Sequence, residues 1–223
     1  MDASLRNYLT SLLPKQQDWV RKMEEQAKKD RVPIMEPVSM QFVMQLIRLQ
    51  KPSRILELGT AIGYSALRML DANPESMIVT IERDEERYRQ AVTNVRAHNK
   101  QGQIDIMHGD ALEIVSDVLV KGPFDMLFID AAKGKYQQFF SLYSPVVVKD
   151  GLIITDNVLF KGYVDDPEKE HPRFKKLGQK IRNYNDWLIS NPDYITSIVP
   201  IGDGVAMSVK KEGSMPDPWW KDQ

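Results

Sequence analysis

The sequence predicts an α/β protein built on a doubly wound, Rossmann-like sheet, and two observations support this fold class. Between residues 55 and 155, short apolar segments alternate with amphipathic segments, which is typical of a parallel sheet covered by helices on both faces. Further along, two strand-like segments flank Gly202-Asp203-Gly204 and predict an antiparallel β-hairpin. We therefore expect a seven-stranded, mostly parallel sheet in an α/β/α sandwich, preceded by additional N-terminal helices.

Three helices are expected before the sheet. Apolar residues recur at helical spacing on both sides of Pro14; they are Leu5, Leu9, Leu12, Leu13, Trp19, Val20, Met23 and Ala27. Prolines disfavour helix in the residue that precedes them, so the segment 31–37, which contains two prolines, is expected to be an extended loop. A third helix is predicted from about Val38 to Gln50, before Pro52.

The sheet and its helices follow in alternation. Short apolar runs predict strands at residues 55–58, 77–82, 104–107, 124–130 and 152–155, the last one after an Asp150-Gly151 turn. Amphipathic segments predict helices at residues 64–71, 84–99, 111–120 and 136–143. A longer helix carries an apolar stripe of Phe174, Leu177, Ile181, Tyr184 and Leu188. The hairpin strands are predicted at residues 194–201 and 205–211.

Length and composition are those of an ordinary globular domain. With 223 residues, 42% hydrophobic and 27% charged, we expect one domain (1–223) made of N-terminal helices (1–50), a core (51–211) and a tail (212–223). Neither an apolar run of membrane-spanning length nor a signal-peptide pattern is present. The absence of cysteine excludes disulfides and fits a cytoplasmic protein. Because the net charge is −1, any contact with nucleic acid requires a local basic patch.

A glycine turn between the first strand and its helix is the first candidate for a binding site. The segment 54–68 predicts a strand, a turn from Gly59 to Gly63 and a helix that starts near Tyr64. Such a turn places free backbone N–H groups at a positive helix end, where a polar cofactor can bind. The glycine spacing matches neither a nicotinamide-binding loop nor a phosphate loop. Glu57 favours a ligand with a cationic group, such as S-adenosylmethionine, although a purely structural turn is equally compatible with this stretch.

Two further carboxylates follow the next strands. Glu82 lies 23 residues after Gly59, a distance at which a carboxylate accepts hydrogen bonds from the ribose hydroxyls of an adenosine. Asp110 is placed to accept a hydrogen bond from the adenine amino group. The structural alternatives are that Glu82 favours the N-terminus of the next helix and that Asp110 caps a helix at Ala111.

Asp130, Asp156 and Asn157 stand at the ends of two strands that we expect to be neighbours. Two carboxylates and an amide oxygen are hard ligands that suit Mg²⁺, whereas the alternative is that Asp156 and Asn157 only form an Asx turn. Lys133 follows Asp130 by three residues, so its amine can reach a ligand held by the metal. A lysine beside a divalent cation loses its proton more readily, as a general base must.

Four segments together resemble the magnesium-dependent O-methyltransferases related to catechol and caffeoyl-CoA O-methyltransferases. They are Leu-Glu-Leu-Gly-Thr-Ala-Ile-Gly-Tyr-Ser (56–65), Ile-Glu (81–82), Phe-Ile-Asp-Ala-Ala-Lys (128–133) and Thr-Asp-Asn (155–157). The resemblance covers about residues 30–211 and implies the class I methyltransferase fold with S-adenosyl-L-methionine and Mg²⁺. It implies that the cofactor is bound by Met35, Glu57, Gly59, Ser65, Glu82, Asp110 and Asp130, the metal by Asp130, Asp156 and Asn157, and that Lys133 is the catalytic base.

Three longer segments, at residues 32–36, 129–140 and 154–162, resemble a narrower bacterial branch of this family. This branch is the tRNA 5-hydroxyuridine methyltransferases. This resemblance implies that the acceptor is 5-hydroxyuridine at the wobble position of the tRNA anticodon loop, and that the product is 5-methoxyuridine. The 5-hydroxyl and the neighbouring O4 of this base offer two adjacent oxygens to a metal, as the two hydroxyls of a catechol do.

A basic run would supply the phosphate contacts of a tRNA substrate. Arg173, Lys175, Lys176, Lys180 and Arg182 lie in a stretch without acidic residues, and Lys161 follows the metal pair. We expect Lys161, Arg173, Lys175 and Lys176 to contact tRNA, although a solvated helix face explains the same pattern. Two alternative functions remain: methylation of a small catechol or caffeoyl-CoA-like phenol, and a non-catalytic cofactor-binding module.

The remaining expectations concern assembly. The family resemblance implies a homodimer, and the N-terminal helices are where its interface is expected. Trp219 and Trp220 follow two prolines and are interpreted as a tail that packs on the domain or on the partner subunit.

Overall fold

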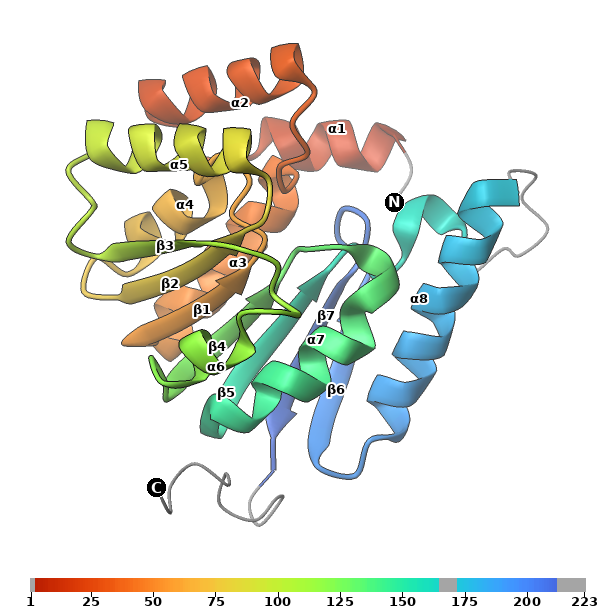
Figure 1. Cartoon of the computed structure of the whole chain (residues 1–223). Helices are drawn as coiled ribbons and strands as arrows, with labels where there is room; N and C mark the ends of the chain where they lie inside the picture. Colours follow the sequence, from red (N-terminus) through yellow and green to blue (C-terminus); the bar gives the residue numbers. More distant parts are fainter. Residues whose placement is uncertain (1–2, 165–171, 212–223) are drawn as a thin grey trace.

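A computed structural model describes residues 3–164 and 172–211, without the side chains of Ala3, Lys161, Pro172 and Arg173. Its centre is a seven-stranded sheet in the order β3-β2-β1-β4-β5-β7-β6 (Figure 1). The strands are β1 Arg54–Leu58, β2 Met77–Glu82, β3 Ile104–His108, β4 Phe124–Ile129, β5 Val147–Asp156, β6 Tyr194–Val199 and β7 Val205–Lys210. The first five are parallel, and β7 pairs antiparallel with both β5 and β6.

Helices cover both faces of this sheet (Figure 1). One face packs against α2 Asp18–Asp30, α3 Pro37–Gln50, α4 Tyr64–Ala72 and α5 Glu85–Ala97, and the other against α6 Val115–Leu119, α7 Tyr136–Tyr143 and α8 Pro172–Ser190. The N-terminal helix α1 Ala3–Ser11 contacts α3. Successive side chains of β1 alternate between the faces, so Ile55 joins one apolar cluster and Leu56 the other. The predicted fold class is confirmed.

Several element boundaries differ from the prediction by one or two residues, and two larger differences have local reasons. The helix expected at 111–120 spans only α6, because Asp110 forms a turn instead: its carboxylate Oδ1 accepts the N–H of Leu112 at 2.9 Å and its carbonyl accepts the N–H of Glu113 at 2.8 Å. β5 is longer than expected at its start. The chain passes through Asp150 in a left-handed conformation (φ 59°) and stays in the strand, with a register shift against β4 between Phe124 and Met126.

Some expectations have no counterpart in residues 3–164 and 172–211. The proposed packing of Trp219 and Trp220 lies outside these residues, and the predicted contacts of Lys161 and Arg173 involve side chains that the structure does not describe. Within the described ranges, no helix combines the length and the apolar character needed to cross a membrane.

Candidate active site

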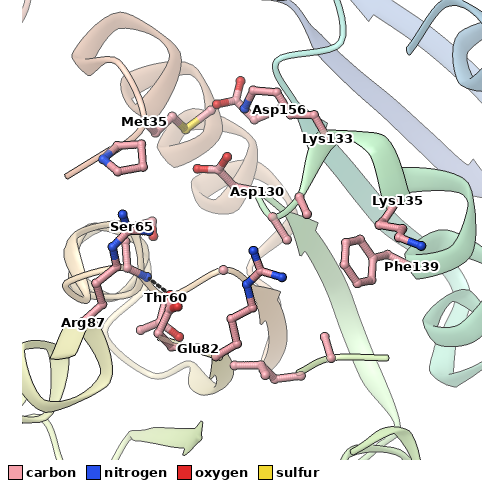
Figure 2. Close-up of a pocket in the computed structure, with 18 of the residues that line it drawn as sticks. Met35, Thr60, Ser65, Glu82, Arg87, Asp130, Lys133, Lys135, Phe139 and Asp156 are labelled. Atoms are coloured by element: carbon pink, nitrogen blue, oxygen red, sulfur yellow. Dashed lines mark hydrogen bonds between the residues drawn. The ribbon is translucent and has the colours of Figure 1, made fainter. Parts of the chain in front are cut away.

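A cavity of about 330 Å³ lies at the carboxyl ends of the parallel strands, where ligands bind in doubly wound sheets. Thr60, Ser65, Glu82 and Arg87 line one side of it (Figure 2). Asp130, Lys133, Asp156, Lys135 and Phe139 line the other (Figure 2). The cavity therefore joins the glycine turn after β1 to the polar ends of β4 and β5.

The glycine turn adopts a shape that only glycine permits at its first position. Gly59 has φ +102°, and a Cβ atom there would collide with the carbonyl oxygen of Asp130. Gly63 is the N-cap of α4, also with positive φ (+83°), and no side chain caps this helix. The first residues of α4, Tyr64 and Ser65, line the cavity, so the positive end of the helix faces the ligand space.

Glu57 lies behind the cavity wall rather than on it. Its side chain is fully buried and is absent from the cavity lining. Ser65 Oγ donates a hydrogen bond to Glu57 Oε1, and Thr80 Oγ1 donates to Oε2 at 2.5 Å. Burial, opposed by these two hydroxyl groups, raises the pKa of Glu57 to about 7. The structure therefore connects Glu57 to the cavity through Ser65.

Glu82 holds the loops around the cavity together. Its Oε2 accepts the backbone N–H of Ala61 in the glycine turn, and its Oε1 accepts that of Asp84 at the start of α5, both at 2.8 Å. Glu82 thus supports the helix start, as the structural alternative expected, and still lines the cavity. Asp110 also lines the cavity, where Arg83 Nη1 lies 3.7 Å from its Oδ2.

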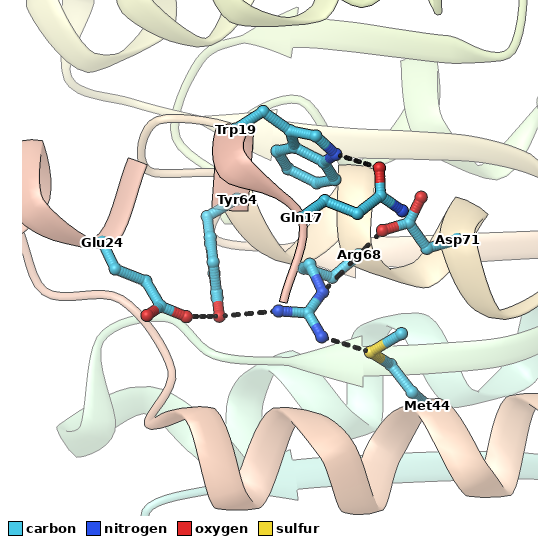
Figure 3. Close-up of polar contacts among 7 residues, drawn as sticks. All are labelled: Gln17, Trp19, Glu24, Met44, Tyr64, Arg68 and Asp71. Carbon is cyan, nitrogen blue, oxygen red and sulfur yellow. Dashed lines mark hydrogen bonds and ion pairs between the residues drawn. The ribbon is translucent and has the colours of Figure 1, made fainter. Parts of the chain in front are cut away.

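Helix α2 supports the glycine turn from outside through partly buried polar contacts (Figure 3). Tyr64 OH donates to Glu24 Oε1 at 2.7 Å and accepts from Arg68 Nη1 at 3.3 Å. Arg68 also reaches Met44 Sδ (3.1 Å) and Asp71 (3.9 Å), although it is only 6% exposed. These contacts connect α2, α3 and α4 beneath a residue that lines the cavity.

Asp130, Lys133, Asp156 and Asn157 converge because β4 and β5 are adjacent. Lys133 Nζ donates to Asn157 Oδ1, and Asn157 Nδ2 donates to Asp156 Oδ2 at 3.0 Å. Asp156 is 2% exposed, and its Oδ1 has no hydrogen-bond partner in the described structure. Burial, reinforced by the charge of Asp130, raises the pKa of Asp156 well above its usual value, and burial also raises the pKa of Asp130.

These side chains fit a divalent cation. Two close carboxylates with raised pKa values and a buried, unpartnered Asp156 oxygen are the environment that a cation would stabilise. Among the described residues, no cluster of three or more His, Cys, Asp or Glu side chains could hold a metal. Of the side chains that meet here, those that would hold a cation are Asp130, Asp156 and Asn157, whose amide oxygen also accepts from Lys133 Nζ.

The cavity contains most of the predicted site residues and several that the motifs did not single out. Met35, Gly59, Ser65, Glu82, Asp110, Asp130, Lys133, Asp156 and Asn157 line it, whereas Glu57 does not. Thr60, Arg83, Arg87, Lys135 and Phe139 also line it. Of these, Thr60, Arg83 and Lys135 stand one or two residues from the predicted residues Gly59, Glu82 and Lys133. Closeness to a motif was the signal that could have identified them. Lys175 and Lys176 lie exposed on α8, outside the cavity lining.

Comparison with known proteins gives consistent matches. The chain matches the O-methyltransferase family model over residues 11–211. It is 29% identical to a catechol O-methyltransferase of Niastella koreensis, covering 93% of this chain and 97% of that one. A Staphylococcus aureus crystal structure provisionally assigned as a caffeoyl-CoA O-methyltransferase is 36% identical, with a TM-score of 0.86 over 92% of this chain and 98% of that chain. The O-methyltransferase TomG of Streptomyces achromogenes, solved with S-adenosylmethionine, is 25% identical (TM-score 0.78; 93% and 96% covered).

Proposed function

Since the chain belongs to the O-methyltransferase family, we propose that it transfers the methyl group of S-adenosylmethionine to a hydroxyl whose neighbour is a second oxygen. The observation that carries this proposal is the meeting of Lys133, Asp130, Asp156 and Asn157 in one cavity with the glycine turn and Glu82. The relation to TomG, which was solved with S-adenosylmethionine, supports the identity of the methyl donor.

The donor is proposed to lie along the glycine turn. The N-terminus of α4 and the backbone around Gly59 bind the carboxylate of S-adenosylmethionine, and Glu82 accepts hydrogen bonds from the ribose hydroxyls of the same molecule. Asp110 and Met35 contact the adenosine end. Glu57 acts on the donor indirectly. It orients the hydroxyl of Ser65, and Ser65 lines the cavity.

The acceptor is proposed to lie beside Lys133. Asp130, Asp156 and Asn157 would hold Mg²⁺, whose chemistry when bound is to stabilise an acceptor oxyanion. Lys133, as the neutral amine, accepts the hydroxyl proton at Nζ. The oxygen then attacks the methyl carbon opposite the sulfonium sulfur, so that the O–CH3 bond forms as the S–CH3 bond breaks and S-adenosylhomocysteine leaves. Attack of an anion on a cation removes charge, so the positioning of the two substrates and the exclusion of water are the main contributions of the protein.

The acceptor we propose is 5-hydroxyuridine at the wobble position of tRNA, with 5-methoxyuridine as product. Its 5-hydroxyl and O4 supply the pair of adjacent oxygens, and the exposed lysines of α8, Lys175 and Lys176, supply phosphate contacts. Lys161 and Arg173 are proposed as further tRNA contacts. A target base in the anticodon loop is unpaired and can enter a cavity of this kind.

A small catechol is the second candidate acceptor. The similarity to the Niastella koreensis catechol O-methyltransferase along nearly the whole chain favours it. One experiment separates the two: the protein is incubated with S-adenosylmethionine and Mg²⁺, and either hydroxyuridine-containing tRNA or catechol, and products are measured by mass spectrometry. Methylation of the nucleoside at least tenfold faster per unit concentration supports the tRNA proposal. Preferential methylation of catechol contradicts it, and methylation of neither contradicts both.

A further inference from the structure

A second, larger groove adjoins the candidate acceptor site. Its volume is about 700 Å³, and it lies between the η1 turn (Lys133–Lys135), α7 and α8. Leu112, Lys133 and Lys135 line both this groove and the main cavity. A molecule whose reactive end enters the cavity therefore has a continuous path along the groove.

Among the described residues, the groove is lined by three lysines, by neutral polar side chains and by the apolar side chains of Leu112 and Leu142, and by no carboxylate. Lys135 and Lys180 are both exposed, and neither has an ion-pair partner among the described residues. Gln138 and Asn183 add neutral hydrogen-bonding groups. A surface of this composition attracts an elongated polyanion.

Lys180 lies beside the turn that carries the proposed base. A Cβ atom added at Gly134 would lie 3.7 Å from Lys180 Cδ and 3.8 Å from its Nζ. Gly134 lies between Lys133 and Lys135, so α8 brings a third ammonium group to this turn. Lys176 precedes Lys180 by one helical turn and lies on the same side of α8, although it is not part of the groove lining.

We propose that this groove binds the phosphodiester backbone of the nucleotides next to the target base, with Lys180 and Lys135 as the phosphate-binding residues. The inference rests on the proposed function, since it assigns the groove to the part of an RNA acceptor that stays outside the cavity. A catechol carries no phosphate and would leave the groove unused. Lys180 lines the groove and not the main cavity, so it can be changed without touching the reacting groups.

The test is a Lys180→Glu variant of the whole protein, compared with Lys180→Arg and with Lys29→Glu. Lys29 is an exposed residue of α2, on the opposite face of the sheet from α8. The binding probe is a fluorescently labelled anticodon stem-loop with an unmodified uridine, titrated at several salt concentrations. Lys180→Glu should weaken binding at least tenfold and lower the slope of log affinity against log salt by about one. Lys180→Arg and Lys29→Glu should bind like the wild type.

Turnover separates this inference from the proposed function. In Lys180→Glu, methylation of a hydroxyuridine stem-loop should fall at least tenfold, while methylation of catechol and binding of S-adenosylmethionine stay unchanged. Wild-type RNA affinity and salt slope in Lys180→Glu would overturn the groove assignment. A selective loss of turnover with a coenzyme A thioester, with RNA binding intact, would overturn it as well. If the wild type methylates neither acceptor but Lys180→Glu still weakens RNA binding, the result would support the assignment of the groove to RNA and contradict the proposed function.

Discussion

Lys133 is the proposed general base, and its Nζ donates to the side chain of Asn157, a proposed metal ligand. Lys133→Ala should lower kcat by about 10²–10⁴-fold, the usual contribution of a general base, while binding of S-adenosylmethionine stays near normal. Turnover by mass spectrometry and donor affinity by calorimetry measure the two effects. Lys29→Ala on α2 serves as a matched control, and full activity in the Lys133 variant would contradict the assignment.

Glu57 makes stability depend on pH. Its pKa is raised to about 7 in the folded protein, so the folded state binds more protons than the unfolded state between about pH 4.5 and 7. Its stabilising contribution is complete below that range and is lost as the pH rises through 7. Between pH 5 and pH 7.5, the contribution of Glu57 to the free energy of unfolding falls by roughly 2 kcal/mol.

The Glu57→Gln variant removes this titration. The free energy of unfolding is measured with urea at pH 5 and at pH 7.5. Its fall between the two pH values should be smaller for Glu57→Gln than for the wild type, by roughly 2 kcal/mol. An identical fall in both proteins would show that Glu57 ionises in the folded state as it does in the unfolded chain.

At the scale of elements, the turn between β1 and α4 is defined by close backbone approach. Gly59→Ala should destabilise the protein by more than about 2 kcal/mol, because a methyl group meets the carbonyl of Asp130 at a positive φ. Gly102→Ala, which has no atom within 4 Å of the added carbon, should change the free energy of unfolding by less than about 0.5 kcal/mol. Equal effects in the two variants would contradict the tight-turn explanation.

Helix α2 is joined to α4 through the hydrogen bond between Tyr64 and Glu24. Tyr64→Phe should lower the free energy of unfolding by about 1–3 kcal/mol, because the buried Arg68 and the Glu24 carboxylate both lose a partner. Glu24→Gln keeps an acceptor for the Tyr64 hydroxyl and should cost less. Denaturant unfolding gives both values, and a larger loss in Glu24→Gln would show that charge rather than hydrogen bonding stabilises this contact.

For the whole molecule, the order of the sheet decides which strand ends meet. β4 lies between β1 and β5, which brings the proposed donor site and the proposed acceptor site to the same edge. Removal of divalent ions with EDTA should abolish turnover while S-adenosylmethionine still binds, and added Mg²⁺ should restore activity. Undiminished turnover after chelation would contradict the assignment of Asp130, Asp156 and Asn157 as metal ligands.

The expected homodimer remains a prediction, and α1 suggests where to test it. Leu5, Tyr8 and Leu12 recur at helical spacing and are 46%, 61% and 60% exposed, which is unfavourable for a face that meets only water. Tyr8→Asp combined with Leu12→Asp should shift the protein to the monomer in sedimentation experiments. An unchanged sedimentation coefficient would place the interface elsewhere or show that the wild type is monomeric.

Motif spacing was sufficient to predict the fold class and most residues of the cavity, because these depend on local patterns. Apolar periodicity marked the strands, and polar residues at strand ends marked the edge of the sheet where Asp130 and Asp156 meet. The extent of α6 was wrong because Asp110 uses its hydrogen bonds to form a turn, which competes with helix at short range.

Other features required the folded chain, because they depend on contacts between segments distant in sequence. Glu57 is a strand-end carboxylate in the sequence, yet Ser65 and Thr80 enclose it behind the cavity wall. The support of Tyr64 by Glu24 spans 40 residues, and Lys180 reaches Gly134 only because α8 crosses the η1 turn. Residue types and local spacing thus indicate the chemistry, whereas burial and long-range packing decide which side chains face the ligand.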